Sequence, residues 1–394
     1  MLPKRILDYG KSGNVIREIS EYGKQRAREI GPENLYDFSI GNPSVPCPEQ
    51  VTQTLISLLQ TVPAKKLHAY TAAPGDPGVR QAVADYLNGR FGRHCSGDGI
   101  YLTAGAAAAL AISLTALLNP GEEVILPAPF FSEYVVYTEQ AGGVPVIVPC
   151  RSDFQLDVDV IERAITEKTR VLLLNSPNNP SGVVLRREGL VQLFYFLRKM
   201  EAEYGHSIYL ISDEPYRALV YDGVEVPWLP ALYRDTLVCS SFSKSLSLPG
   251  ERIGYITVSP EMPDFAEVNA AVNGAGRALG YICAPSLFQQ VAARCLGMTA
   301  DVSVYARNRD LLYNSLQEMG YACVRPDGAF YLFVKTPEPD VVAFCERAKQ
   351  YEIFVVPGDD FCAPGYVRVA YCVETAVIER ALPAFRALAQ SYGL

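Results

Sequence analysis

A lysine and an arginine eight residues apart are the residues of this sequence whose types and spacing most directly suggest chemistry. Lys244 closes the segment Ser241-Phe-Ser243-Lys, directly after an apolar run, and Arg252 follows within Pro-Gly-Glu-Arg-Ile-Gly. A lysine amine becomes a Schiff-base nucleophile when a nearby cation depresses its pKa. Arginine grips a phosphate through two parallel hydrogen bonds. We therefore expect Lys244 to react with a carbonyl group, beside the hydroxyls of Ser241 and Ser243 and a phosphate held by Arg252. A solvated loop lysine is the alternative.

Two polar segments follow two consecutive apolar runs. The first is Asn175-Ser-Pro-Asn-Asn179-Pro-Ser-Gly182, and the second is Ser-Asp213-Glu-Pro-Tyr216. An aspartate at the end of a buried strand is costly unless it meets a cation, and a protonated pyridine nitrogen would be such a cation. Tyr216 and Asn179 could then hydrogen-bond a phenolic oxygen on the same ring. The alternatives are a plain turn for residues 175–182 and a helix N-cap for Asp213.

A run of small residues, Thr103-Ala-Gly-Ala-Ala-Ala-Ala-Leu110, connects an apolar strand pattern to a helical pattern. The N-terminus of a helix offers free amides and a partial positive charge, and small side chains let an anion approach them. The run matches neither GxxxxGK[ST] nor GxGxxG. It therefore suggests an anion site at a helix start, with an ordinary alanine-rich helix as the alternative.

Two further side chains could contact a ligand. Phe131, in Pro-Phe-Phe131, could cover a planar ring, although core packing is the alternative. Arg368 stands in Tyr366–Tyr371, a segment that is otherwise apolar or aromatic. An arginine that points inward from such a strand needs an anionic partner, and a substrate carboxylate would serve. A position at the edge of a sheet is the alternative for Arg368.

The elements that must position these residues are short apolar runs alternating with helical stretches. The predicted strands are Ile100–Thr103, Glu123–Leu126, Val144–Val148, Arg170–Leu174, Ile208–Ser212, Leu237–Ser240 and Gly254–Val258. Such alternation indicates an α/β fold with a mostly parallel seven-stranded sheet covered by helices on both faces. Ligands of these sheets bind beyond the carboxyl ends of the strands. Most of the clusters above directly follow one of these runs.

The two ends of the chain are predicted to form a smaller α+β unit. An amphipathic helix is expected over Asn14–Ile30, followed by an extended segment over Leu35–Ile40. One long helical stretch is expected over Gln289–Met319, and strand and helix patterns alternate after it: 330–334, 341–351, 353–356, 366–369 and 376–390. We therefore expect a large domain over 48–288 and a small domain over 289–394, joined by the N-terminal segment 1–47.

Composition limits the kinds of partner. Lysine and arginine number 35 against 43 aspartates and glutamates, a net charge of −8. This balance argues against nucleic-acid binding, which requires a basic surface. The longest small and apolar run, Ala104–Leu118, is shorter than the roughly 20 residues of a membrane span. No signal-peptide pattern, no CxxC and only three scattered histidines are present. We expect a cytoplasmic protein without a metal site or a membrane partner.

Together these residues resemble the class I/II aminotransferases, in particular enzymes like aspartate aminotransferase. These are pyridoxal 5'-phosphate enzymes of fold type I. The resemblance extends from Gly41-Asn-Pro to Arg368, and its most specific motif is SxSK followed by PGxRxG. It implies the fold-type-I architecture, pyridoxal phosphate as the cofactor, and a homodimer with shared active sites.

The resemblance also implies roles for single residues. Lys244 would form the Schiff base with the cofactor and move the substrate proton, and Asp213 would pair with the ring nitrogen. The remaining cofactor contacts would come from side chains and amides around the ring and phosphate, namely Tyr216, Asn179, Phe131, Ser241, Ser243, Arg252, Ala106, Ala107 and, from the neighbouring subunit, Tyr70. For the substrate, Gly41 would lie alongside and Arg368 would bind the α-carboxylate.

The expected activity is amino-group transfer from an L-amino acid to a 2-oxo acid in a ping-pong cycle. A C–S β-lyase or a decarboxylase is the alternative, because all three pass through the same carbanion. Many aspartate enzymes of the family carry Trp where Phe131 stands, and others carry Lys where Ala107 and Ala108 stand, which weakens an aspartate assignment. Arg277, 33 residues after Lys244, is the candidate for binding a distal carboxylate across the dimer. A surface arginine at a helix end is the alternative.

Overall fold

The computed structural model describes residues 2–11, 15–92 and 95–394. Its centre is a seven-stranded sheet with the order β2-β8-β7-β6-β5-β3-β4. All seven predicted strands are present, as β2 (Ile100–Thr103), β3 (Glu123–Ala128), β4 (Val144–Pro149), β5 (Thr169–Asn175), β6 (Tyr209–Asp213), β7 (Thr236–Ser241) and β8 (Gly254–Val258). Strand β8 is antiparallel to both its neighbours and the other pairs are parallel. The predicted fold class is confirmed.

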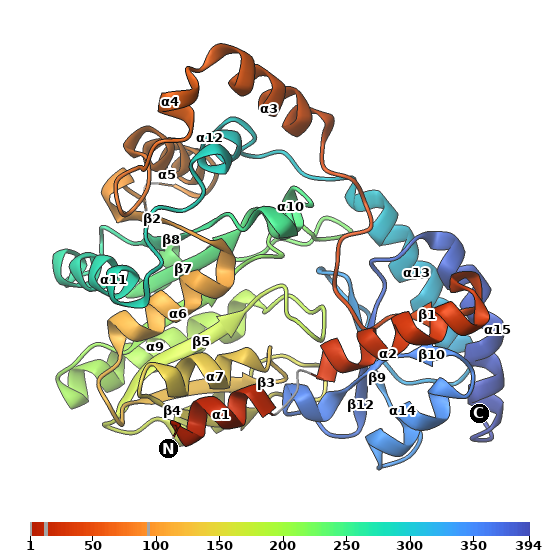
Figure 1. Ribbon diagram of the computed structural model, residues 1–394. Helices are drawn as coiled ribbons and strands as arrows, with labels where there is room; N and C mark the ends of the chain where they lie inside the picture. Colours follow the sequence, from red (N-terminus) through yellow and green to blue (C-terminus); the bar gives the residue numbers. More distant parts are fainter. Residues whose placement is uncertain (1, 12–14, 93–94) are drawn as a thin grey trace.

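Helices cover both faces of this sheet (Figure 1). Alternate residues of one strand enter different cores: on β6, Ile211 packs with helix α6 while Leu210 packs with α9. Because both faces are covered, the strands are apolar almost throughout. The helices around the sheet are α3 (Glu49–Thr61), α4 (Ala64–Leu67), α5 (Pro77–Phe91), α6 (Gly105–Leu117), α7 (Glu133–Gln140), α8 (Val158–Ala164), α9 (Arg187–Tyr204), α10 (Phe242–Ser245) and α11 (Phe265–Leu279).

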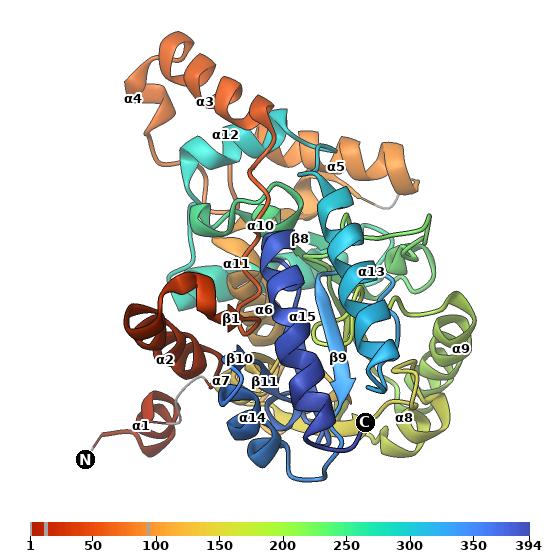
Figure 2. The same ribbon diagram turned by 90° about the vertical axis from the view of Figure 1, so that its right-hand side faces the viewer.

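The second part of the molecule combines the two ends of the chain. Strands β11 (Val356–Pro357), β12 (Tyr366–Ala370) and β9 (Tyr331–Lys335) form an antiparallel sheet in that order. The predicted extended segment supplies β1 (Tyr36–Asp37), which pairs in parallel with β10 (Ile353–Phe354). Helix α2 (Val15–Ile30) packs beside this region through Ile19, and helices α14 (Val341–Lys349) and α15 (Thr375–Gln390) lie close to it (Figure 2). Helix α2 and strand β1 of the N-terminal segment therefore pack with the C-terminal part.

The single long helix predicted over residues 289–319 is wrong. The chain instead forms α12 (Ser286–Arg294) and α13 (Val302–Glu318). Gly297 has φ of +80° between them, and Asp301 caps α13 by accepting a hydrogen bond from the Ser303 amide at 3.0 Å. Helix α12 packs in the core beside α3 and α5, whereas α13 packs in the C-terminal core. The predicted domain boundaries stay predictions, although this packing favours a break between Met298 and Ala300.

The remaining elements are short. Helix α1 (Lys4–Lys11) contacts α7, where Arg5 donates to the Glu139 carbonyl at 2.7 Å. Of the predicted helix 14–30, position 14 lies outside the described residues. The described helices include none long and apolar enough to cross a membrane. The 3-10 turns are η1 (Pro32–Asn34), η2 (Gly97–Gly99), η3 (Leu229–Ala231), η4 (Pro249–Glu251) and η5 (Gly358–Phe361).

Candidate active site

A cavity of about 270 Å³ lies beyond the carboxyl ends of β5, β6 and β7. It brings together most of the predicted site residues: Gly41, Ala106, Ala107, Phe131, Asn179, Asp213, Tyr216, Ser241, Ser243, Lys244, Arg252 and Arg368. Two predicted residues do not line it. Tyr70 is 96% exposed before α5, and Arg277 is exposed on α11. Both were expected to act on a neighbouring subunit, so their roles stay predictions.

Lys244 lies on the short helix α10, and its side chain points into the cavity. Its Nζ donates a hydrogen bond to the Gly41 carbonyl at 2.7 Å and lies 5.3 Å from the centre of the Phe330 ring. The pKa of Lys244 is lowered to about 8, mainly by burial and also by the charges of Arg368 and Arg252, against an opposing effect of Cys372. The solvated-loop alternative is therefore wrong, and the amine is prepared for nucleophilic and base chemistry.

Asp213 is the last residue of β6 and is buried. Its Oδ2 accepts a hydrogen bond from the Tyr134 hydroxyl at 2.5 Å, while Oδ1 has no partner among the described residues. Burial raises the pKa of Asp213 to about 7, against the lowering effect of Tyr134. Residues 214–228, all described, contain no helix, so the helix-cap alternative is wrong. A buried carboxylate oxygen without a partner fits the protonated ring nitrogen of pyridoxal phosphate.

The start of α6 and Arg252 form a cradle for an anion. Helix α6 begins at Gly105, and its N-cap residue Ala104 offers no side-chain hydrogen bond to the first amides. Gly105 has φ of +82°, and a Cβ at this position would lie 2.5 Å from Nη2 of Arg252. The amides of Ala106 and Ala107 belong to the first turn, where helix amides lack an intrahelical partner. Guanidinium and free amides together fit a phosphate dianion.

The turn that follows β5 is tied to the strands around it. The side-chain Nδ2 of Asn175 donates to the Asp213 backbone carbonyl at 2.9 Å, and its Oδ1 accepts from the Asn179 backbone amide at 2.7 Å. Tyr216 and Tyr331 share a hydrogen bond between their hydroxyls at 2.8 Å. Residues after β5 do form a turn, as the alternative expected, but Asn179 within this turn also lines the cavity. Asn179 and Tyr216 thus lie where a ring hydroxyl could be bound.

Arg368 is buried in the middle of a sheet. Its strand, β12, lies between β11 and β9, and the residue is 2% exposed, so the edge-strand alternative is wrong. Its guanidinium donates to the Ser39 carbonyl at 2.6 Å and to Oδ1 of Asn179 at 3.0 Å, and it lies 4.6 Å from the Tyr331 ring centre. Its Nε has no partner among the described residues. Since its hydrogen-bond partners are uncharged, Arg368 can bind an anion that enters the cavity.

Several residues of the site were not predicted. Tyr331 and Ile16 line the cavity, and Tyr134 and Phe330 contact Asp213 and Lys244 from outside it. Tyr134 lies three residues after Phe131 at the start of α7, and the two rings meet edge to face at 5.8 Å. Helical spacing could have indicated Tyr134. Tyr331 and Ile16 come from distant segments and carry no local signal.

Comparison with known proteins agrees with this geometry. The model of the family "aminotransferase class I and II" matches residues 33–385. The chain is 32% identical over 385 residues to an aspartate aminotransferase of Thermotoga maritima, covering 93% of this chain and 97% of that protein. It is 31% identical over 378 residues to aromatic-amino-acid aminotransferase 2 of Thermococcus litoralis, covering 89% and 91%.

A solved structure of an amino transferase from Eubacterium rectale matches with a TM-score of 0.98 and 48% identity, covering 100% of both chains. Pyridoxal phosphate is therefore the cofactor of this enzyme, and the anion cradle, the unpartnered Asp213 oxygen and Lys244 have the chemistry that it requires. From the cavity and these similarities together, the chain belongs to the class I and II aminotransferases, pyridoxal-phosphate-dependent enzymes that move an amino group from an amino acid to a 2-oxo acid.

Proposed function

We propose that Lys244 and Asp213 carry the proton chemistry of the amino-group transfer, with Tyr216 beside them. Bound pyridoxal phosphate supplies the electron sink that makes the Cα proton of the amino acid acidic. Lys244 moves that proton, because a pKa of about 8 leaves part of the amine neutral near pH 7. Asp213 holds the ring nitrogen protonated through its unpartnered Oδ1. Tyr216, hydrogen-bonded to Tyr331, holds the ring oxygen together with Asn179.

We further propose that Arg368 binds the α-carboxylate of every substrate. The observation that carries this role is that Arg368 is a buried arginine without a carboxylate partner among the described residues. It is 2% exposed, and its Nε has no hydrogen-bond partner among them. The Tyr331 hydroxyl also closes one side, since a Cβ on Gly41 would lie 2.0 Å from it. Because position 41 has no room for a side chain, only the backbone of Gly41 would lie beside the substrate.

Glutamate and 2-oxoglutarate are proposed as one substrate pair, with an aspartate or an aromatic amino acid as the second donor. The relatives named above act on aspartate and on aromatic amino acids, which supports a broad enzyme. Arg277 is the candidate for the distal carboxylate of a dicarboxylic substrate. It is exposed on α11, four residues before Tyr281, and does not line its own chain's cavity, so we propose that it serves the cavity of the partner.

A homodimer with shared active sites completes the proposal. Tyr70, Tyr281 and Ile282 are exposed apolar side chains on adjoining segments. The segments are tied together where the Cys283 amide donates to the Ala73 carbonyl at 3.2 Å. An exposed apolar patch of this kind is typical of a protein interface. In a dimer built through this face, Tyr70 would reach the partner's phosphate.

The test is a donor and acceptor screen on the purified, cofactor-loaded enzyme. Aspartate, glutamate, tyrosine, phenylalanine and alanine are each paired with 2-oxoglutarate, oxaloacetate and pyruvate, and the new amino acid is measured. We expect turnover only when a 2-oxo acid is present, and fastest with 2-oxoglutarate as the acceptor. Cystathionine, whose β-carbon carries a thiolate leaving group, is incubated without an acceptor as the test of the alternative. Release of pyruvate and ammonia from it would instead indicate the lyase, which the comparisons do not favour.

The Arg368 role has its own variant. Arg368→Gln should raise the KM for every donor by about tenfold or more, because a charge-assisted bidentate contact is lost.

Arg277→Ala should raise the KM for glutamate and leave that for alanine nearly unchanged. Equal effects of Arg277→Ala on both donors would remove the distal-carboxylate role and leave the transaminase assignment intact.

A further inference from the structure

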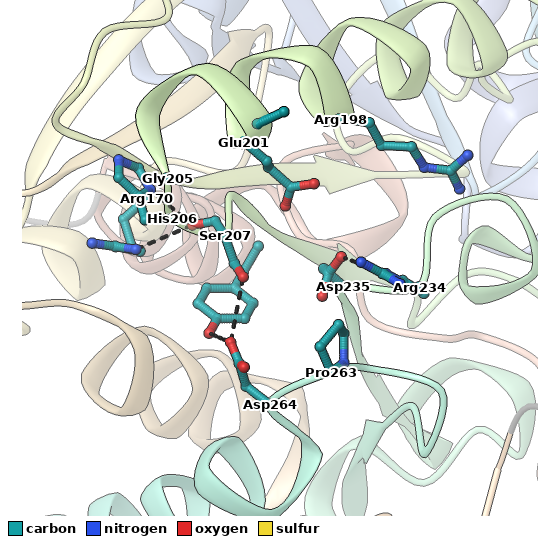
Figure 3. Close-up of a pocket in the computed structure, with 12 residues that line it drawn as sticks. Arg170, Arg198, Glu201, Gly205, His206, Ser207, Arg234, Asp235, Pro263 and Asp264 are labelled. Atoms are coloured by element: carbon teal, nitrogen blue, oxygen red, sulfur yellow. Dashed lines mark hydrogen bonds and ion pairs between the residues drawn. The ribbon is translucent and has the colours of Figure 1, made fainter.

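A second cavity, of about 860 Å³, lies at the opposite edge of the central sheet (Figure 3). It is lined where β5, β6 and β7 begin, by Arg170, Tyr209 and Asp235. The end of α9 supplies Glu201, and Asp264 stands just before α11. Since the active site lies beyond the carboxyl ends of the same strands, this cavity is separate from it.

Three carboxylates face this cavity, from Glu201, Asp235 and Asp264 (Figure 3). Asp235 is 2% exposed, and its Oδ1 has no hydrogen-bond partner among the described residues. Its other oxygen meets only the Nε of Arg234, at 3.4 Å, and the Arg234 side chain is 58% exposed. A buried carboxylate this poorly paired is costly unless a cation joins it.

The other groups of the cavity do not supply that cation. Arg170 is already committed to Glu122, at 2.7 and 3.0 Å, and Arg198 donates to the Leu232 carbonyl at 2.9 Å. Burial and the charge of Asp264 raise the pKa of Asp235, although Arg234 and Arg198 oppose the rise. Among the described residues, none of these arginines donates a hydrogen bond to Oδ1 of Asp235.

The kind of cation follows from the number of acceptors that the cavity offers. Among the described residues, no group of three or more His, Cys, Asp or Glu side chains could hold a metal ion. A primary ammonium carries three N–H donors on a compact charge, so it can pair with a single carboxylate and does not need several carboxylate ligands around it. Asp264 already accepts from the Tyr209 hydroxyl at 3.1 Å and Glu201 from the Tyr233 hydroxyl at 2.8 Å. Both are thus held in place, with Asp235 as the unpartnered acceptor.

We propose that this cavity is a second ligand site, for a small molecule that carries a primary ammonium group, with Asp235 as its principal partner. The ammonium displaces Arg234 from its long contact and donates to Asp235, in a cavity that Glu201 and Asp264 also line. The exposed guanidinium of Arg234 and that of Arg198 then face the rest of the ligand. The source is either a diamine or an amino acid whose carboxylate meets those arginines, and the shared recognition is through the ammonium.

The test uses the cofactor-loaded enzyme after borohydride reduction, so that primary amines cannot react with the cofactor. Binding of 1,4-diaminobutane, 6-aminohexanoate, pentanoate and Mg²⁺ is measured by calorimetric titration. We expect one ammonium compound or both to bind once per chain and pentanoate not to bind. Binding of the diamine alone identifies a free amine as the ligand class, and tighter binding of 6-aminohexanoate identifies an amino acid.

Variants of the carboxylates that line the cavity test whether the ligand binds there. Asp235→Asn should weaken it by about tenfold or more, the effect of losing one charge-assisted hydrogen bond. Glu203→Gln, on the same helix as Glu201 but exposed, is the control and should bind like the parent. If Asp235→Asn does not fold by circular dichroism, Asp264→Asn takes its place and should also weaken binding. Absence of binding by both ammonium compounds, equal affinity in the carboxylate variants, or preferred binding of pentanoate or Mg²⁺ would overturn the proposal.

Discussion

Lys244 owes its reactivity to its surroundings. Its amine makes one short hydrogen bond, to the Gly41 carbonyl at 2.7 Å, and burial lowers its pKa to about 8. Burial disfavours the charged form, because an ammonium in a cavity loses hydration that the protein replaces only partly. At pH 7 the neutral fraction is then far larger than for a lysine of ordinary pKa near 10.4.

This pKa predicts how the apoenzyme takes up its cofactor. Only the neutral amine attacks an aldehyde, so the uptake rate should rise about tenfold per pH unit below pH 8 and level off above it. Stopped-flow absorbance of the imine band at several pH values measures this. Borohydride should then trap the cofactor on Lys244, and Lys244→Ala should show no band. A midpoint near that of an exposed lysine would contradict the account.

Asp213 should matter for rate more than for stability. Asp213→Asn removes the charge that is proposed to keep the ring nitrogen protonated, and we expect a rate loss of at least about a hundredfold, or about 2.7 kcal/mol of transition-state stabilisation. Tyr134→Phe keeps the carboxylate and removes only the hydrogen bond to Oδ2, so it serves as the matched control with a smaller loss. Steady-state rates of both variants, each compared with the parent, measure the two losses. A variant within about fivefold of the parent would make Asp213 a structural residue.

The raised pKa of Asp213, about 7, has a consequence for apoenzyme stability. Between the ordinary value of about 3.9 and pH 7 the folded state holds a proton that the unfolded state has released. The contribution of Asp213 is therefore fully present at low pH and is lost as pH rises through 7. The melting temperature of apo Asp213→Asn minus that of the apo parent should therefore be larger at pH 8 than at pH 5. The opposite order would mean that the carboxylate is well solvated or paired.

At the scale of single elements, the start of α6 shows how a backbone position limits a binding site. Gly105 combines φ of +82° with a closest approach of 2.5 Å between an added Cβ and Arg252. Gly105→Ala should therefore displace Arg252 and weaken cofactor binding by about tenfold or more. Absorbance titration of the apoenzyme with pyridoxal phosphate measures the affinity.

Gly189→Ala is the control for that experiment. Gly189 lies in α9, and an added Cβ there meets nothing within 4 Å. Alanine in a helix is favoured over glycine by about 0.5–1 kcal/mol, so this variant should be slightly more stable and should bind the cofactor normally. Equal cofactor affinity in the two variants would show that Arg252 can move aside freely.

For the whole molecule, the proposed dimer predicts complementation between two impaired chains. Tyr70 is almost fully exposed, is not among the residues that line its own chain's cavity, and is proposed to serve the partner. A hybrid of Tyr70→Phe and Lys244→Ala chains would then hold one site with both residues intact. Its activity should exceed the mean of the two parent homodimers. Activity equal to that mean, or a fully active monomer at nanomolar concentration, would contradict shared sites.

Much of this protein follows from local sequence pattern. The seven strands of the large sheet were predictable because a strand covered on both faces is apolar throughout, and turns rich in Gly, Pro and Asn separate it from the next helix. Lys244 and Asp213 were predictable because each ends or follows such a strand with a distinctive residue order, and Arg252 because it stands in a distinctive segment just before one. The carboxyl ends of neighbouring parallel strands meet at one edge, so Lys244 and Asp213 had to converge. Strand β8 is antiparallel to β7 and begins at that same edge, which brings Arg252 there as well.

Other features depended on contacts between distant segments. The break before α13 was missed although Gly297 and Asp301 mark it, because periodicity carried across the gap. No local pattern links Tyr331 to Tyr216, 115 residues away, or shows that Arg368 meets only uncharged acceptors. The residue types, their order and the strand ends were thus set by sequence alone. Burial, the pKa shifts of Lys244 and Asp213, and the unpartnered oxygens of Asp213 and Asp235 came only from tertiary packing, since desolvation depends on what the rest of the chain places around a group.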